Sequence, residues 1–233
     1  MQVIFEICLI FIENVLEYKN IGVDDMNTKE RLIQMHSLLE KEYPDAKCSL
    51  ITENNLQLLI STELSAQCKD ERVNEVTKEL YKRYKSAKDF AEADLAEIEG
   101  YIKSLGLYKN KAKNIKEGCK KICEIYGGEV PGTMDELLTI DGVGRKTANL
   151  VLGEAFGVPS IVVDTHASRL SKRMGFTKNT EPYKIEMDLK KIVPPEIQTK
   201  LCHRFVLHGR KYCVARSPKC EICPLKDICP KII

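Results

Sequence analysis

The sequence predicts an all-α fold, and three features lead to this prediction. Apolar residues recur three and four positions apart along most of the chain after Met26, which is the spacing of one helix face. Capping residues precede several of these stretches, and glycines follow them. The one convincing strand-like run, residues 160–163, has no partner strand. With 43% hydrophobic and 30% charged residues among 233, the chain can bury a core, which excludes global disorder.

The predicted helices follow one another in order. The first starts after Met26, where Asn27 and Glu30 have the spacing of a capping box. Asp94 with Glu97 resembles a second box, and Gly106 suits the end of that helix. The expected apolar faces are Leu32, Ile33, His36 and Leu39; Leu56, Leu59, Ile60 and Leu64; Val73, Val76, Leu80 and Tyr84; Ile98, Ile102 and Leu105; and Ala112, Ile115, Cys119, Ile122 and Tyr126. Later helices are expected from Thr133, over about 146–156, from Asp164 to Met174, and from Pro195 to His208.

The N-terminal residues 1–25 need a separate interpretation. Residues 1–16 are apolar but contain Glu6 and Glu13, have no basic start and no small-residue cleavage site, and are too short to span a bilayer. We therefore expect neither a secretory signal nor a membrane anchor. Either translation starts at Met26 and residues 1–25 lie outside the fold, or they form an extra helix packed on it. Mass analysis of the native N-terminus distinguishes the two.

Charge is distributed unevenly along the chain. Residues 1–141 carry 19 Lys+Arg against 26 Asp+Glu, whereas residues 142–233 carry 17 against 8. A basic C-terminal portion favours a polyanionic partner, and nucleic acid is the commonest one. On its own, this pattern would favour a solvated basic surface over a binding site.

The segment IDGVGRK has the form of a turn that holds a phosphate. Gly142 and Gly144 can adopt positive φ and expose backbone N–H groups, and a helix begins directly after them. Arg145 and Lys146 add positive charge. The alternative is an ordinary packing corner between two helices, since two glycines alone are weak support.

Lys146 and Asp164 are the candidate catalytic residues. A lysine near a helix N-terminus is locally unfavourable, and the helix dipole with partial burial would lower its pKa and free the amine as a nucleophile. Asp164 is a good N-cap for the helix that follows it. It is also a candidate carboxylate that accepts a proton or stabilises a sugar cation, and the two roles are compatible.

Four of the ten cysteines lie near the C-terminus, at Cys213, Cys220, Cys223 and Cys229. Four thiolates in one loop suit either Zn²⁺ or an iron–sulfur cluster. Zinc ribbons more often have two CxxC pairs, and this loop has one, so the spacing favours iron–sulfur without deciding it. The other cysteines are expected in the core.

Together these motifs resemble endonuclease III, a family of helix-hairpin-helix DNA glycosylases with lyase activity. The residues that carry the resemblance are LTIDGVGRKTANLVLGEAFG, VDTH, the four cysteines, LSAQCKDERVN at 64–74 and GLYKNKAKNI at 106–115. It extends from about Met26 to Cys229. The resemblance implies an oxidised-pyrimidine glycosylase that nicks 3′ to the abasic site through a lysine Schiff base, and a [4Fe–4S] cluster on the four cysteines.

The resemblance also assigns roles to residues. Lys146 and Asp164 match the catalytic pair, and Gly142, Val143 and Gly144 match the phosphate-binding hairpin, followed by Arg145 as a further DNA contact. Gln67 matches the residue that fills the gap left by an extruded base, and Leu107 matches a second wedge. Asp141 departs from the proline usual in the family, and its charge beside a phosphate site could weaken DNA binding. We expect it to cap the following turn.

The family fold implies two helical lobes with a DNA-binding groove between them. The expected lobes are residues 48–158, with six helices and the hairpin, and residues 26–47 plus 159–233, with the cluster. Damaged or abasic duplex DNA is the expected partner, with no membrane, and the expected state is a cytoplasmic monomer, at the nucleoid in a prokaryote. Three rivals are a monofunctional mismatch or adenine glycosylase, which usually lacks Lys146, a non-catalytic DNA-binding module, and a helical protein with a zinc knuckle.

Overall fold

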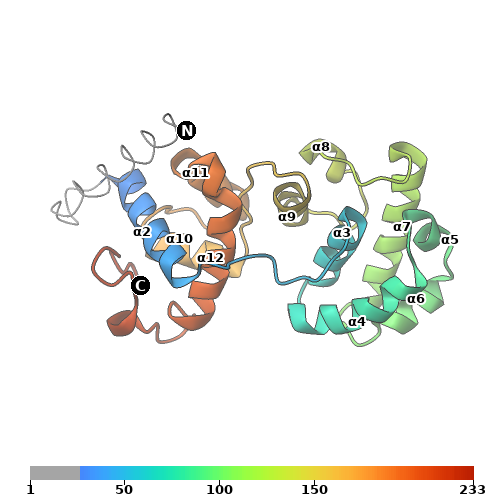
Figure 1. Cartoon of the computed structure of the whole chain (residues 1–233), viewed down its shortest axis with the longest axis horizontal. Coiled ribbons are helices and arrows are strands. Elements are labelled where there is room, and N and C mark those ends of the chain that lie inside the picture. The colour runs from blue at the N-terminus through green and yellow to red at the C-terminus, as the bar shows by residue number, and fades with distance from the viewer. Residues whose placement is uncertain (1–26) are drawn as a thin grey trace, which may run out of the picture.

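The computed structural model describes residues 27–233, and every regular element in this range is helical (Figure 1). The α-helices are α2 (Thr28–Glu42), α3 (Asn55–Leu64), α4 (Asp70–Arg83), α5 (Ala87–Glu92), α6 (Leu95–Ile102), α7 (Tyr108–Tyr126), α8 (Met134–Leu137), α9 (Arg145–Ala155), α10 (Thr165–Arg173), α11 (Pro182–Ile192) and α12 (Gln198–Lys211). Two short 3₁₀ helices are η2 (Pro195–Ile197) and η3 (Cys220–Ile222). The predicted all-α class is confirmed.

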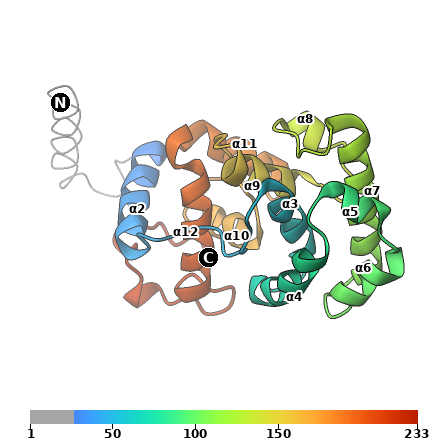
Figure 2. The same cartoon turned by 45° about the vertical axis from the view of Figure 1, so that its right-hand side comes forward.

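Two hydrophobic cores divide the molecule. One is built from α3 to α9, with buried side chains from Leu50 to Leu152. The other joins α2 to α10, α11, α12 and the C-terminal loop, so residues from opposite ends of the chain share it. Figures 1 and 2 both show α2 beside α12, with α3 to α8 at the other end of the molecule. Leu150 of α9 packs against both cores, so this helix joins the two lobes.

Capping residues fix several of the helix ends. Asn27 and Glu30 form the predicted capping box of α2. Gly127 ends α7 in the left-handed region at φ 63°. Asp94 accepts from Ala96 N and caps α6, but Glu97 pairs with Arg83 instead of completing a box.

Some expectations about individual elements were wrong. Gly106 does not end α6, because that helix stops at Ile102. Ile33 is exposed, and Met35 takes its place in the buried face of α2. Two helices, α5 and α11, were not predicted at all.

The interpretation of residues 1–25, including a translation start at Met26, lies outside the described residues. Within residues 27–233, no helix is long and apolar enough to cross a bilayer.

Candidate active site and C-terminal cysteine loop

The turn between α8 and α9 depends on Gly142. Its φ of 81° lies in the left-handed region, and a Cβ on it would clash with the Glu63 carboxyl and with Asn114. Gly144 does not use the positive φ that the sequence allowed: it is the extended N-cap of α9, at φ −92°. No side chain caps α9, so the first N–H groups of the helix have no side-chain acceptor. Val143 is buried and anchors the turn by donating to Ile140 O.

Asp141 has a different partner from the one expected. Its carboxylate lies 3.4 Å from the Lys121 ammonium of α7 and makes no capping bond to the turn. The expected capping role was therefore wrong. The ion pair offsets part of the negative charge beside the hairpin.

Lys146 and Asp164 occupy the N-terminal ends of two helices. Lys146 is the second residue of α9 and is exposed. Asp164 is the N-cap of α10, where its Oδ1 accepts from Ala167 N at 2.7 Å, so it is held rigidly. Burial lowers the pKa of His166, while Asp164 raises it and Lys146 lowers it. The helices that begin at these two residues, α9 and α10, both pack against α12.

His166 was not predicted as a site residue. Arg169 Nη2 lies 3.1 Å from its Nδ1, and the same nitrogen donates to Gly209 O. The guanidinium also reaches Cys213 O through Nε at 3.0 Å. Arg169 therefore links the helix that carries Asp164 to the start of the cysteine loop.

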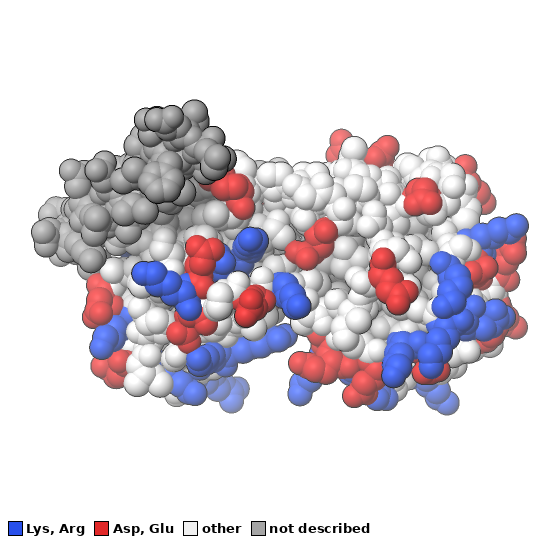
Figure 3. All heavy atoms as spheres, viewed as in Figure 1, with Lys and Arg blue, Asp and Glu red and all other residues white. Residues whose placement is uncertain are grey.

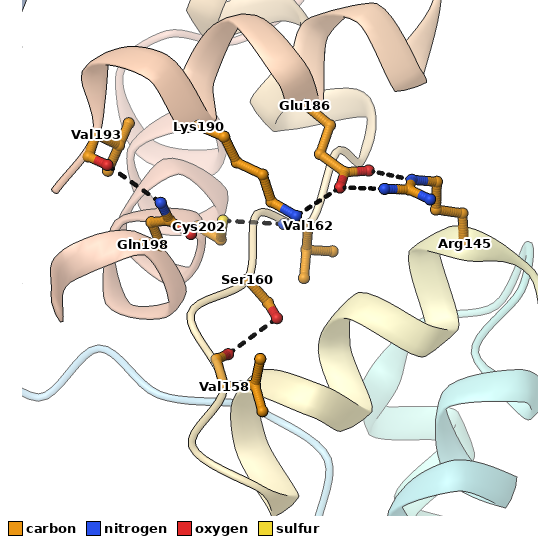
Figure 4. A network of polar contacts seen from close by, with 9 residues as sticks. All are labelled: Arg145, Val158, Ser160, Val162, Glu186, Lys190, Val193, Gln198 and Cys202. Carbon is orange, nitrogen blue, oxygen red and sulfur yellow. Dashed lines mark hydrogen bonds and ion pairs between the residues drawn. The ribbon is translucent and has the colours of Figure 1, made fainter. Parts of the chain in front are cut away.

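Arg145 is held by a buried carboxylate on the other lobe. Figure 4 shows its guanidinium facing Glu186 of α11, which also binds Lys190 at 2.9 Å. The Glu186 side chain is 3% exposed. The Tyr183 ring lies 4.7 Å from the Arg145 guanidinium carbon. Sequence reasoning missed this cluster, although Glu186 and Lys190 have the i,i+4 spacing of a helical ion pair.

Gln67 and Leu107 are exposed residues in short loops. Gln67 follows α3, and Leu107 immediately precedes α7. Both have left-handed backbones, at φ 57° and 61°, and the Leu107 side chain is 56% exposed. Their exposure suits side chains that contact a partner.

Glu63 lies beneath the hairpin in the last turn of α3. It is 7% exposed, and its Oε1 has no hydrogen-bond partner. Burial raises its pKa to about 8, against smaller lowering effects from Asn114 and Lys111. No sequence signal pointed to Glu63, because its burial depends on packing against the turn at Gly142.

The four C-terminal cysteines line one pocket. None of them is in a disulfide. His208 Nε2 lies 3.5 Å from Cys223 Sγ, and Arg173 Nη1 lies 3.5 Å from Cys213 Sγ. Within residues 27–233 no three His, Cys, Asp or Glu side chains group as ligands of a single ion. Four unpaired thiols around a shared space, with nearby donors to sulfur, fit a multi-iron cluster.

Basic side chains do not form a single-sign patch on the face seen in Figure 3, where blue and red atoms are interspersed. Arg216 and Lys219, between the cysteines, are both exposed. The basic excess of residues 142–233 is therefore partly neutralised locally, as at Glu186.

The sequence and fold were compared with those of known proteins. A model of the HhH-GPD superfamily of base excision DNA repair proteins matches residues 60–195, more than half of the chain. The iron–sulfur binding domain of endonuclease III matches residues 213–229. Endonuclease III of Synechocystis sp. is 49% identical over 203 residues, which cover 87% of this chain and 93% of that relative. The chain belongs to the endonuclease III family.

Other members of the endonuclease III family agree with this placement. The Bacillus subtilis protein is 47% identical over 188 residues, covering 80% of this chain and 86% of the relative. Two solved structures, a non-covalent endonuclease III–DNA complex and a trapped endonuclease III–DNA covalent intermediate, each superpose with a TM-score of 0.84 at 45% identity. Each superposition covers 88% of this chain and 97% of the chain in the solved structure. The fold is thus two helical lobes with a helix-hairpin-helix motif and a C-terminal loop for a [4Fe–4S] cluster.

Proposed function

We propose that the chain is a bifunctional DNA glycosylase and AP lyase of base excision repair, acting on damaged pyrimidines in duplex DNA. One observation carries the proposal. Lys146 directly follows the hairpin in the first turn of α9, and Asp164 is held rigidly at the N-cap of α10, in a fold that superposes on DNA-bound endonuclease III. A trapped covalent intermediate of endonuclease III with DNA supports a mechanism in which the enzyme bonds to its substrate.

The hairpin would position the DNA strand. Backbone N–H groups of Gly142 and Gly144, with the free first turn of α9, suit a phosphate oxygen, while Val143, whose N–H donates to Ile140 O, would hold the hairpin in shape. Arg145 would add positive charge beside the phosphate while its guanidinium stays on Glu186. These contacts set the register of the enzyme on DNA without reading sequence.

A base inside a duplex is unreachable, so the damaged nucleotide has to leave the stack. Gln67 would fill the gap and hydrogen-bond the orphaned base, and Leu107 would act as a second wedge. Both are exposed and lie at the ends of helices that fix their positions. The inserted side chains would replace part of the stacking that is lost.

Lys146 and Asp164 would then carry the chemistry. As the glycosidic bond breaks, the base leaves with the bonding electrons, and the Asp164 carboxylate stabilises the positive charge on the sugar. The Lys146 amine, through its nitrogen lone pair, bonds to C1′. The C1′–O4′ bond then breaks as one amine proton passes to O4′, which gives a protonated imine. Solvent water takes a proton from C2′, a C2′=C3′ double bond forms, and the 3′ phosphate leaves with the electrons of the C3′–O bond. Water cannot form an imine, so the amine is required for the nick.

The four cysteines would hold the [4Fe–4S] cluster as a structural group that shapes the loop. Arg216 and Lys219 would then meet DNA phosphates. A purified protein that absorbs at about 400 nm and contains iron supports the assignment. Stoichiometric zinc without that absorbance would overturn it.

The proposed lobes are residues 48–158 and residues 26–47 plus 159–233, in line with the two hydrophobic cores. We further propose a cytoplasmic monomer that is nucleoid-associated if its source is a prokaryote.

The test is incision of a panel of duplexes carrying thymine glycol, an abasic site, uracil opposite G, or adenine opposite 8-oxoguanine. We expect excision and nicking at thymine glycol and nicking at the abasic site. Base release without a nick would instead identify a monofunctional glycosylase. Binding without either reaction would identify a non-catalytic DNA-binding protein.

A further inference from the structure

The two proposed wedge residues have the same unusual backbone conformation. Gln67 and Leu107 are both in the left-handed region, at φ 57° and 61°. Residues with a side chain rarely adopt it, because it is strained unless the surrounding structure holds it. Something in the fold must therefore fix these two loops.

Lys111 contacts both loops. Its ammonium donates to Leu64 O and Ala66 O, each at 2.8 Å, and lies 3.4 Å from Cys68 Sγ. Ala66 and Cys68 are the two neighbours of Gln67 in the sequence. The backbone N–H of Lys111 donates to Leu107 O at 3.0 Å. The ammonium thus holds two carbonyls that precede Gln67 and contacts the side chain of the residue that follows it, whereas the bond to Leu107 O is the main-chain bond of the first turn of α7.

Burial makes this lysine unlike the other basic residues of α7. Only 4% of Lys111 is exposed, and within residues 27–233 no carboxylate lies within ion-pair distance of it. Lys111 lowers the pKa of the Glu63 carboxyl, but burial outweighs this effect, and the two side chains form no direct ion pair. A buried ammonium without a direct ion pair is costly, and an apolar side chain would fill the space at lower cost. The acceptors that Lys111 satisfies are carbonyls at the C-terminal end of α3, where positive charge is favourable. The contacts of Lys111 therefore stabilise the loop that contains Gln67 and not the hydrophobic core.

We propose that Lys111 is a positioning residue whose side chain anchors the Gln67 loop to α7, the helix that begins directly after Leu107, a role that rests on the proposed function of Gln67. Without the ammonium, the carbonyls of Leu64 and Ala66, which lead into Gln67, lose their donor, and the left-handed conformation is no longer enforced. The wedge would then enter the duplex less often. The loss should appear in base extrusion before it appears in lyase chemistry.

The experiment compares Lys111→Met with a matched control, Lys116→Met. Lys116 lies on the same helix and donates to Ala93 O, far along the chain from either wedge loop. Single-turnover excision from a thymine glycol duplex should fall about 10-fold in Lys111→Met, since small misplacements of a positioning group have effects of this size or larger. Nicking of a pre-formed abasic site should fall less. Lys116→Met should match the wild type in both assays.

A double-mutant cycle with Gln67→Ala separates positioning from general stability. If Lys111 acts through Gln67, Lys111→Met causes no further loss of excision in the Gln67→Ala background. A probe of insertion, 2-aminopurine placed opposite an abasic-site analogue, should lose its binding-induced fluorescence change in both single variants. Losses that multiply in the double variant, or an unchanged 2-aminopurine response, would overturn the proposal.

Lys111→Arg provides a second cycle if Lys111→Met melts below the assay temperature. Arginine keeps donors within reach of the carbonyls, so we expect excision between those of the wild type and Gln67→Ala. Excision by Lys111→Arg at or below that of Gln67→Ala, with losses multiplying in the double variant, would again overturn the positioning role. Absence of excision and nicking in the wild type would instead contradict the proposed function, which keeps the two failures distinct.

Discussion

The guanidinium of Arg145 and the carboxylate of Glu186 form a two-pronged ion pair across the two lobes. Arg145 Nε lies 2.7 Å from Oε2, and Nη2 lies 2.9 Å from Oε1. Arg145 is the first residue of α9, next to Lys146, and Glu186 lies in the middle of α11. The pair therefore fixes the helix that carries the candidate nucleophile to the lobe that carries Asp164.

Changing Glu186 to Gln should destabilise the protein by about 2 kcal/mol. The change removes a buried charge from Arg145 and Lys190, and Arg145 is partly exposed, so the loss is smaller than for a fully buried pair. Urea unfolding measures it. Glu181→Gln, which removes an exposed partner of Lys184, is the control and should change stability by less than about 0.5 kcal/mol. Equal losses of stability in the two variants would show that the buried ion pair contributes no more than an exposed one.

Glu186 should also make the stability of the folded protein sensitive to acid. Burial alone raises the pKa of Glu186, but hydrogen bonds from Arg145 and Lys190 outweigh it, and the pKa lies below its ordinary value of 4.5. The folded state therefore gains stability from this group above pH 4.5 and loses it as the pH falls further. The free energies of unfolding of the wild type and Glu186→Gln, measured in urea, should therefore become more similar as the pH falls below 4.5.

Glu63 should make stability fall with rising pH. Its folded pKa of about 8 lies above its ordinary value of 4.5, so the folded state holds a proton that the unfolded state has lost between these values. The contribution of Glu63 to the free energy of unfolding is largest below pH 4.5. It falls by about 1 kcal/mol per pH unit as the pH rises from 4.5 to about 8. Glu63→Gln should remove this slope in urea unfolding between pH 5 and 8. Glu124→Gln, at an exposed site of α7, should keep it, and a slope unchanged in Glu63→Gln would contradict the assignment.

The hairpin glycines should respond differently to alanine. Gly142→Ala should cost about 3 kcal/mol, because it adds left-handed strain and a clash with the Glu63 carboxyl. Gly144→Ala should cost about 1 kcal/mol, since its backbone is extended, a Cβ there meets no atom within 4 Å, and only the N-cap preference is lost. Thermal or urea unfolding ranks the two. A Gly144→Ala variant as unstable as Gly142→Ala would show that the turn is organised in another way.

Asp164→Asn should separate capping from chemistry. Asparagine caps helices as well as aspartate does, so the melting temperature should hardly change. Base excision should fall about 100-fold, because the charge that faces the developing sugar cation is gone. Asp94→Asn, at the N-cap of α6, is the matched control and should excise at the wild-type rate. Normal excision by Asp164→Asn would reduce Asp164 to a capping residue.

Local signals in the sequence predicted the parts of the fold that depend on local chemistry. The box of Asn27 and Glu30 and the stop at Gly127 follow from capping chemistry alone. Helix α5 was missed because it has only six residues, and α11 because it begins at Pro182 and is rich in charge. Both carry signals that could have revealed them: Ser86 forms a capping box, and proline is favoured in the first turn.

The site residues that lie in sequence motifs were predictable. Those whose roles depend on tertiary packing were not. Lys146, Asp164 and the four cysteines lie in contiguous motifs. Glu63 and Glu186 lie outside these motifs. Lys111 lies within GLYKNKAKNI, but its role depends on contacts with residues distant in the sequence, as do those of the other two. No single-sequence pattern shows that a charged side chain of α3, α7 or α11 points inward.

The central claim is that the Lys146 amine forms the covalent bond to DNA. The most direct measurement is borohydride reduction of the enzyme on abasic duplex DNA, followed by mass mapping of the cross-linked peptide, for the wild type and Lys146→Gln. We predict a cross-link at Lys146 in the wild type, and neither cross-link nor strand nick in the variant. A cross-link at another residue, or a trapped adduct in Lys146→Gln, would contradict it.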